Sequence, residues 1–290
     1  MSRGLRCSIV VPHLNDLPRL TRCLDALLPQ LEPGDEVIVV DNGSDFDVAA
    51  ALPDAASLRV LTQSEPGAGP ARNMGVAAAS GEVLLFIDCD CVPGADWVAQ
   101  GRRIAREGVV TGGRVDIFYE TPPPRSGAEA FEAVFAFRMD AYLQRDGFLG
   151  AGNLCMMRAD FDGTGGFRPA VAEDVDWSRR AAAGGLTLAF DDGFVVSHPS
   201  RRDWAALRAK WWRLTREAWL LGCESGGFRA TWALKALAMP VSILAHAPRI
   251  VTAGALSWRE RALALVTLAR LRLQRMVWML GYLVSPPARD

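Results

Sequence analysis

The chain has 290 residues, half of them hydrophobic, which suffices for one large domain or for a domain with an appendage. Its net charge of −1 conceals an asymmetry, with 17 Lys and Arg against 28 Asp and Glu up to His198, and 15 against 5 after it. The six cysteines are scattered through apolar segments, which argues against a secreted disulfide framework, and we expect no signal peptide because a strand pattern begins at residue 7. We therefore expect a cytoplasmic location.

The first third of the chain alternates segments with strand and helix patterns. Apolar runs typical of buried strands occupy residues 7–12, 36–40, 59–62 and 83–91. Between them, leucines recur at helical intervals over 17–31, and a glycine-rich loop leads into a helix that reaches Ala79. This order predicts βαβ units, and therefore an α/β fold with a mostly parallel sheet and flanking helices.

The second third continues the sheet and adds helices. Strand patterns occur at 109–113, 187–190 and 194–197, and a Phe-rich helix is predicted over 128–142. We expect one α/β domain over 1–200 and a basic, amphipathic, helical region over 201–290.

The run at 83–91 ends in two carboxylates one residue apart, Asp88 and Asp90. In an open α/β sheet, ligands bind at the carboxyl ends of strands. Two close carboxylates repel each other unless a cation lies between them, and Mg²⁺ and Mn²⁺ prefer oxygen ligands. A solvated turn is the alternative. We expect Cys89 and Cys91 to be buried thiols on the opposite face of the strand, and not ligands of a soft metal.

Two other nucleotide-binding classes fit the sequence poorly. The loop at 67–69 is not a dinucleotide fingerprint, because Arg72 stands where the third glycine belongs and the loop follows the third strand. A sugar-phosphate nucleotidyltransferase would have a Gly-rich, basic loop after the first strand, where this chain has Pro12 and His13.

Four motifs in order resemble the family 2 glycosyltransferases, which have a GT-A fold. They are the strand that ends at Pro12, Asp41-Asn42-Gly43-Ser44, the segment from Ala71-Arg72-Asn73 to Ser80-Gly81-Glu82, and Asp88-Cys89-Asp90. Segments at 148–154 and 165–185 are similar to later motifs of the family. The resemblance implies a Rossmann-like GT-A sheet, a nucleoside-diphosphate-sugar donor, and a metal-dependent transfer of a hexosyl group with inversion.

The resemblance also implies which residues bind the donor. Asp41 would accept a hydrogen bond from the imide N–H of uracil or thymine, or from a guanine edge, so UDP or dTDP is favoured and GDP is an alternative. Pro12 and Arg72 would lie beside the base or the diphosphate. Gly152 would lie under the donor sugar, where the absence of a side chain allows close approach. A turn-capping Asp41, an Arg72 in a surface salt bridge and a plain Gly-rich turn are the alternatives.

The metal ligands implied by the resemblance are Asp90, which binds directly, Asp88, which lies near the ribose or the metal, and His198, which completes the shell. The cofactor would be Mn²⁺ or Mg²⁺. For His198, a structural histidine at a strand end is the alternative.

Asp174 is the candidate general base, and Glu173 would support it or contact the acceptor. Inverting transfer needs one carboxylate that takes the proton of the acceptor hydroxyl, while the metal neutralises the charge on the leaving nucleotide. The alternative is capping of a helix N-terminus by these acids.

The chain after His198 lacks the Gln-x-x-Arg-Trp signature of processive synthases, because Leu207 stands where the glutamine belongs. Apolar segments at 234–247 and 262–283 are interrupted by charges, which favours interfacial or re-entrant helices over membrane spans. Such helices would contact an anionic membrane surface, and a helical cap or an oligomer interface is the alternative.

These patterns together predict a metal-assisted direct displacement onto an acceptor hydroxyl. We expect a lipid-linked or glycan acceptor, no nucleic-acid partner, and peripheral attachment to the cytoplasmic membrane face. The alternative is a catalytically inactive, nucleotide-sugar-binding scaffold on the same fold.

Overall fold

The computed structural model describes residues 4–169, 171–224 and 227–288, which form two compact units. Unit 1 contains the residues up to Asp116 together with Phe137–Pro169 and Glu173–His198. Unit 2 contains Ile117–Ala136, residues 171–172 and the chain from Pro199 onward. The sequence had placed 117–136 in the first domain. The structure differs because side chains of this segment pack in a cluster of unit 2, including Phe131 beside Leu268.

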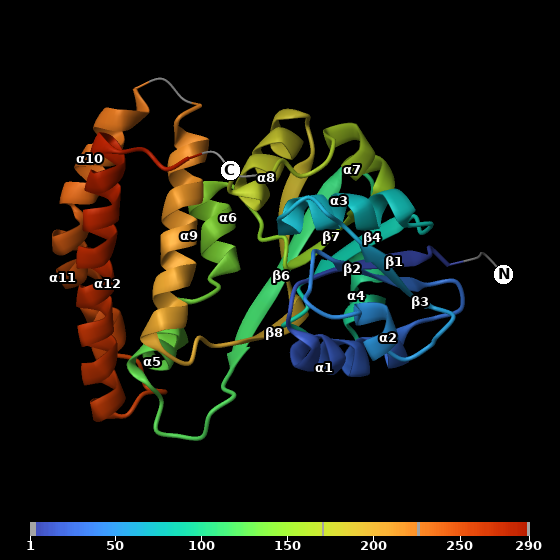
Figure 1. Cartoon of the computed structure of the whole chain (residues 1–290), viewed down its shortest axis with the longest axis horizontal. Coiled ribbons are helices and arrows are strands. Elements are labelled where there is room, and N and C mark those ends of the chain that lie inside the picture. The colour runs from blue at the N-terminus through green and yellow to red at the C-terminus, as the bar shows by residue number, and fades with distance from the viewer. Residues whose placement is uncertain (1–3, 170, 225–226, 289–290) are drawn as a thin grey trace. The chain divides into compact units, whose positions relative to one another are not determined.

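Unit 1 is built on a mixed sheet, which has eight strands among the described residues (Figure 1). In spatial order they are β3 (Leu58–Thr62), β2 (Glu36–Asp41), β1 (Cys7–His13), β4 (Val83–Ile87), β7 (Asn153–Met157), β6 (Val109–Phe118), β8 (Thr187–Pro199) and β5 (Val92–Pro93). The first four pair in parallel, whereas β7 pairs antiparallel with β4 and β6, and β5 antiparallel with β8. The α/β class is confirmed, but the sheet is mixed, because the pairs of β7 with β4 and β6 and of β5 with β8 are antiparallel.

Helices cover both faces of this sheet (Figure 1). They are α1 (Leu17–Leu27), η1 (Leu28–Gln30), α2 (Val48–Ala51), α3 (Ala68–Ala78), α4 (Trp97–Ile104), α6 (Met139–Asp146), α7 (Arg158–Thr164) and α8 (Glu173–Ala183). Strand alternation sends Ile9 and Val11 to the face on which α1, α2 and α4 pack, and Val10 to the face of α3, α7 and α8. All five residues of β4 are fully buried, as expected for a central strand.

Several element boundaries differ from the predictions for local reasons. The helix predicted over 17–31 ends at Leu27, because Pro29 cannot continue it and η1 follows. The chain leaves β4 after Ile87 and turns, with the Cys91 N–H donating to the Asp88 carbonyl at 3.0 Å, so strand alternation does not position the two thiols. The helix predicted over 128–142 is broken near Phe137, whose φ is +50°. Residues 187–199 form one strand.

Unit 2 is helical, which confirms the predicted C-terminal region. Its helices are α5 (Gly127–Phe135), α9 (Trp204–Gly222), α10 (Phe228–Leu237), α11 (Met239–Val251) and α12 (Trp258–Val284). One apolar cluster joins α5, α9, α11 and α12 around Leu268, and a second joins α9, α10 and α12 around Trp219. The N-terminus of α12 has a capping box formed by Ser257 and Glu260.

None of the described helices is by itself both long enough and apolar enough to cross a membrane. One bent pair, α10 with α11, meets the length and composition requirement, and its two helices are inclined by 57°.

Candidate active site

Three parallel strands, β2, β1 and β4, end at the same edge of the sheet of unit 1. In the register, Pro12 lies opposite Val40 and His13 lies opposite Asp41. Asp88 directly follows β4, which pairs with the other side of β1. Because parallel strands present their carboxyl ends at one edge, Pro12, Asp41 and Asp88 come from three separate segments to that edge.

The Asp41 carboxylate is held in place by hydrogen bonds. Its Oδ1 accepts the Ser44 hydroxyl at 2.5 Å and lies 3.5 Å from Nδ1 of the buried His13 ring. The other ring nitrogen, Nε2, accepts the Asp16 N–H at 3.1 Å, which assigns the proton of a neutral ring to Nδ1, on the side of Asp41. His13 therefore positions Asp41. It was missed in the sequence because a lone histidine after a proline has no spacing signal.

The loop between β3 and α3 is tied to the end of β2 by Asn42. Its Oδ1 accepts the Gly67 N–H at 2.6 Å, and its Nδ2 donates to the carbonyls of Gln63 and Glu65 at 3.1 and 2.7 Å. Gly67 has a φ of +122°, a backbone conformation that residues other than glycine rarely adopt. Asn42 thus fixes the start of α3 relative to the end of β2.

Arg72 is 4 % exposed and lies between two carboxylates from distant segments. One of its terminal nitrogens donates to Asp88 Oδ1 at 2.6 Å, and the other donates to Glu173 Oε1. Glu173 Oε2 also accepts the N–H of Gly69, in the first turn of α3, at 2.9 Å. Burial alone would lower the pKa of Arg72, but the two carboxylates outweigh burial and raise it. Arg72 and Glu173 therefore hold α3, β4 and α8 together, and their contacts with a nucleotide or an acceptor remain predictions.

Gly152 lies against the Asp88 carboxylate. A Cβ atom at position 152 would be 2.4 Å from Asp88 Oδ2, a distance that real Cβ atoms do not reach. The contact arises because Asn153, the next residue, pairs with Ile87 at the end of β4. The small-residue segment noted in the sequence thus borders Asp88, and only glycine fits there without moving it.

The side chains of Asp90 and His198 are brought together by the pairing of β5 with β8. Val92 lies opposite Ser197 in this ladder, so the residues just before and just after them become neighbours. Asp90 Oδ2 is 3.1 Å from His198 Nε2, and the ring of Phe137 lies on the buried imidazole, with 4.5 Å between ring centroids. Two of the three predicted metal ligands are therefore in direct contact.

The described residues contain no group of three or more His, Cys, Asp or Glu side chains that could hold a metal ion. The contacts above explain this, because Asp88 faces Arg72 while Asp90 faces His198. A carboxylate oxygen and an imidazole nitrogen are nevertheless suitable donors for Mn²⁺. Asp90 and His198 thus provide two donor atoms of the kind that such an ion binds.

Asp174 differs from the other acids in the first turn of α8. Asp176 is buried and pairs with Arg168 and Arg180, each at 2.9 Å. The Asp174 side chain accepts the Val175 N–H at 2.8 Å and is paired with no arginine among the described residues. Burial first, and then the neighbouring Glu173 carboxylate, raise the pKa of Asp174 to about 6. A partly exposed carboxyl with such a pKa suits a general base near neutral pH.

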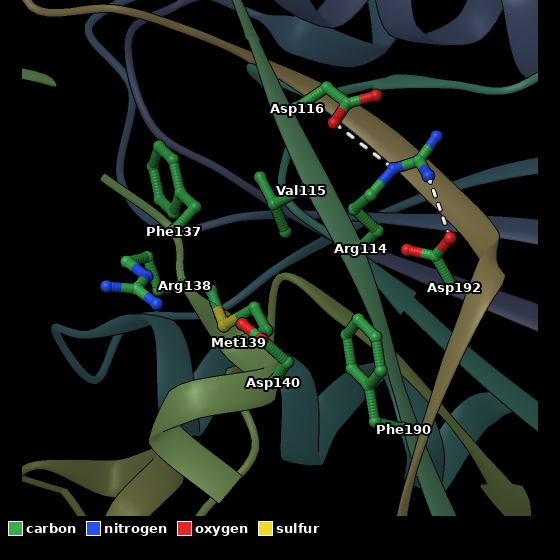
Figure 2. A pocket seen from close by; sticks show the side chains of 9 residues that line it. All are labelled: Arg114, Val115, Asp116, Phe137, Arg138, Met139, Asp140, Phe190 and Asp192. Carbon is green, nitrogen blue, oxygen red and sulfur yellow. Dashed lines mark hydrogen bonds and ion pairs between the residues drawn. The ribbon is translucent and has the colours of Figure 1, made fainter. Parts of the chain in front are cut away.

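A pocket of about 330 Å³ opens on β6, β8 and the start of α6 (Figure 2). Its lining combines apolar side chains with charged ones, namely Arg114, Val115, Asp116, Phe137, Arg138, Met139, Asp140, Phe190 and Asp192. Phe137, which contacts His198, is one wall, so the pocket adjoins the Asp90–His198 pair. Arg114 donates to Asp192 at 3.1 Å and pairs with Asp116 at 3.2 Å. The sequence did not indicate this pocket, because its residues come from three segments without a common motif.

The chain matches the model of glycosyl transferase family 2 over residues 8–165, which is more than half of its length. It belongs to this family. The family 2 assignment is supported by the glycosyltransferase AglE of Haloferax volcanii, which is 30 % identical over 205 residues, or 67 % of each chain. An uncharacterised glycosyltransferase of Mycobacterium tuberculosis is 39 % identical over 104 residues, which is 34 % of this chain and 40 % of that protein.

Two solved structures share the fold of this family 2 chain. The mannosyltransferase PcManGT of Pyrobaculum calidifontis, in complex with GDP-Man and Mn²⁺, has a TM-score of 0.62 and 18 % identity, with 99 % of this chain and 89 % of that chain covered. Residues 1–349 of S. aureus TarS, in complex with UDP-GlcNAc, have a TM-score of 0.54 and 17 % identity, with coverage of 99 % and 93 %. The predicted GT-A fold and a transferase of hexosyltransferase type are confirmed.

Proposed function

We propose that this glycosyltransferase moves a hexosyl group from a nucleoside-diphosphate sugar to an acceptor hydroxyl, with inversion and with the help of a divalent metal. The observation that carries the proposal is the Arg72 link between Asp88 and Glu173. This link ties the start of α8, which bears Asp174, to the strand end that bears Asp88. A base and a donor-binding edge thus belong to one constellation.

The donor would lie along the strand ends. Asp41, held by Ser44 and His13, presents acceptor oxygens for a base N–H, as in uracil or thymine. The solved neighbours contain GDP-Man and UDP-GlcNAc, so a guanine base is the second candidate. The sugar would lie near Gly152, where the absent Cβ leaves space beside Asp88.

Asp90 and His198 would hold Mn²⁺ or Mg²⁺, with Asp88 close by. The bound ion would neutralise the negative charge that develops on the departing diphosphate. Asp174 takes the proton of the acceptor hydroxyl as its oxygen bonds to the anomeric carbon, and the bond from that carbon to the diphosphate oxygen breaks on the opposite face. Because the carboxylate must be ionised to accept a proton, a pKa of about 6 keeps Asp174 competent at neutral pH.

The acceptor would enter the pocket beside Phe137. Aromatic faces such as Phe137 and Phe190, next to the carboxylates of Asp116, Asp140 and Asp192, suit the apolar faces and the hydroxyls of a sugar. A glycan or a lipid-linked saccharide fits this chemistry. Exposed Leu234, Val241 and Leu244 on α10 and α11 support peripheral contact with a membrane.

The proposal is tested by the thermal stability of the pure protein with UDP, GDP, dTDP or CMP, each with and without Mn²⁺. A ligand that binds only the native state raises the unfolding midpoint by mass action. We expect one nucleoside diphosphate to raise the midpoint only when the metal is present, and Asp174→Asn to keep this response while losing transfer. If no nucleotide raises the midpoint, the proposed function is wrong. The alternative of an inactive nucleotide-sugar-binding scaffold is then excluded too, because it also requires nucleotide binding.

A further inference from the structure

Unit 2 contains a seam of arginine and tryptophan side chains between α9 and α12. Arg275 of α12 lies over the ring of Trp211 of α9, with 4.5 Å from its guanidinium carbon to the ring centroid. Arg270 of α12 lies in the same way over Trp204, at 4.0 Å. Cation–π contacts of this kind hold a guanidinium in place but leave its hydrogen-bond donors available.

Arg275 of this seam and Arg272, three positions before it on α12, lack any acid partner among the described residues. Both side chains are partly buried, and the Nε atom of each is inaccessible and has no hydrogen-bond partner. A buried cation elsewhere in unit 2 is compensated, because Glu132 accepts from Lys210 at 2.8 Å and also pairs with Arg201. Arg272 and Arg275 are partly buried as well, but no such carboxylate is paired with them in the described chain.

The pair is unfavourable as it stands. Residues three apart on a helix have Cβ atoms only about 5–6 Å apart, so the two guanidinium groups repel each other. Burial, and then the charge of Arg272, lower the pKa of Arg275, and burial also lowers the pKa of Arg272. Because a guanidinium remains protonated in proteins, deprotonation does not relieve this cost, whereas an anion bound from outside does.

We propose that Arg272 and Arg275 form a binding site for a phosphate ester, separate from the residues that carry the transfer reaction. Two neighbouring forks of N–H donors match the oxygens of a phosphate or diphosphate group, and the Trp211 ring fixes the direction of one fork. The same chemistry is present in a soluble diphosphate and in the headgroup of an anionic lipid. Exposed Val266, Leu273 and Val277, on the same helix, favour the lipid.

The site is tested first with inorganic pyrophosphate and the full chain, in EDTA and at constant ionic strength. We expect saturating pyrophosphate to raise the unfolding midpoint of the native protein by about 5 °C. The double variant Arg272→Gln, Arg275→Gln should show no rise, and its midpoint without ligand should equal or exceed that of the native protein, since the repulsion is gone. Arg270→Gln, an exposed arginine of the same helix, is the matched control and should keep the response.

The source of the phosphate is distinguished by sedimentation with vesicles of phosphatidylcholine, with or without phosphatidic acid. Loss of binding to phosphatidic acid in the double variant assigns the site to a lipid headgroup, whereas a change in the pyrophosphate response alone assigns it to a soluble ester. Equal behaviour of the native protein and the double variant in both assays overturns the proposal. If the double variant does not fold, Arg275→Lys takes its place, because lysine keeps the positive charge but lacks the fork of N–H donors. An unchanged rise of the midpoint with pyrophosphate in Arg275→Lys would also overturn the proposal. The metal-dependent nucleotide response is a separate measurement, so either proposal can fail alone.

Discussion

The pH dependence of transfer follows from the environment of Asp174. A general base works as the ionised carboxylate, so activity should fall as the pH falls through the pKa of about 6. At pH 5 about 9 % of this carboxyl is ionised and at pH 7 about 91 %, so kcat/KM should rise about tenfold between them. Initial rates of nucleotide release, in buffers of constant ionic strength and with saturating Mn²⁺, measure this acid limb.

Two variants separate Asp174 from other groups that titrate in this range. Asp174→Asn should lower kcat by about 10²- to 10⁴-fold and remove the acid limb from the residual activity. Glu173→Gln removes the neighbouring negative charge that raises the pKa of Asp174, so its acid limb should move to lower pH. An acid limb that persists in Asp174→Asn would refute the assignment of the base.

Three further substitutions test the rest of the site. Arg72→Met leaves the partly exposed carboxylates of Asp88 and Glu173 without their buried partner. Urea denaturation should therefore show a loss of about 2 kcal/mol in unfolding free energy, and no loss would contradict the proposed link of Arg72 to these carboxylates. Gly152→Ala places a Cβ against Asp88 and should weaken metal-dependent nucleotide binding at least about tenfold, whereas Gly150→Ala meets only the flexible end of a methionine and is the control. His198→Ala should raise the Mn²⁺ concentration needed for the nucleotide response by about 10- to 100-fold, and an unchanged Mn²⁺ titration would remove it from the site.

Much of the active-site edge could be predicted because it depends on local patterns. Apolar runs that end at Pro12, Asp41 and Asp88 specify buried strands, and parallel pairing then brings their ends together. The order of the motifs was enough to predict the family, and the apolar helical segments were enough to predict a helical region after His198.

The remaining features depend on contacts between residues far apart in the chain. The Arg72 guanidinium donates to the carboxylate of Glu173, which is 101 residues away in the chain. No sequence pattern in either segment predicts this contact. The antiparallel pairing of β7 with β4 depends on where the chain returns to the sheet, which the apolar pattern of a strand does not specify. Likewise, the local sequence of the Phe-rich segment does not show that this segment packs in one apolar cluster with Leu268, so its place in unit 2 could not be predicted.

The stereochemistry of the reaction tests the central claim most directly. When water replaces the acceptor hydroxyl, it attacks the anomeric carbon slowly and the free sugar is released. NMR resolves the anomeric proton of this sugar before mutarotation. With an α-linked nucleotide sugar of the base selected by the stability measurements, the account predicts that the β-anomer appears first and that Asp174→Asn slows its formation by at least about 100-fold. Early appearance of the α-anomer, or an undiminished rate in Asp174→Asn, would contradict direct displacement with Asp174 as the base.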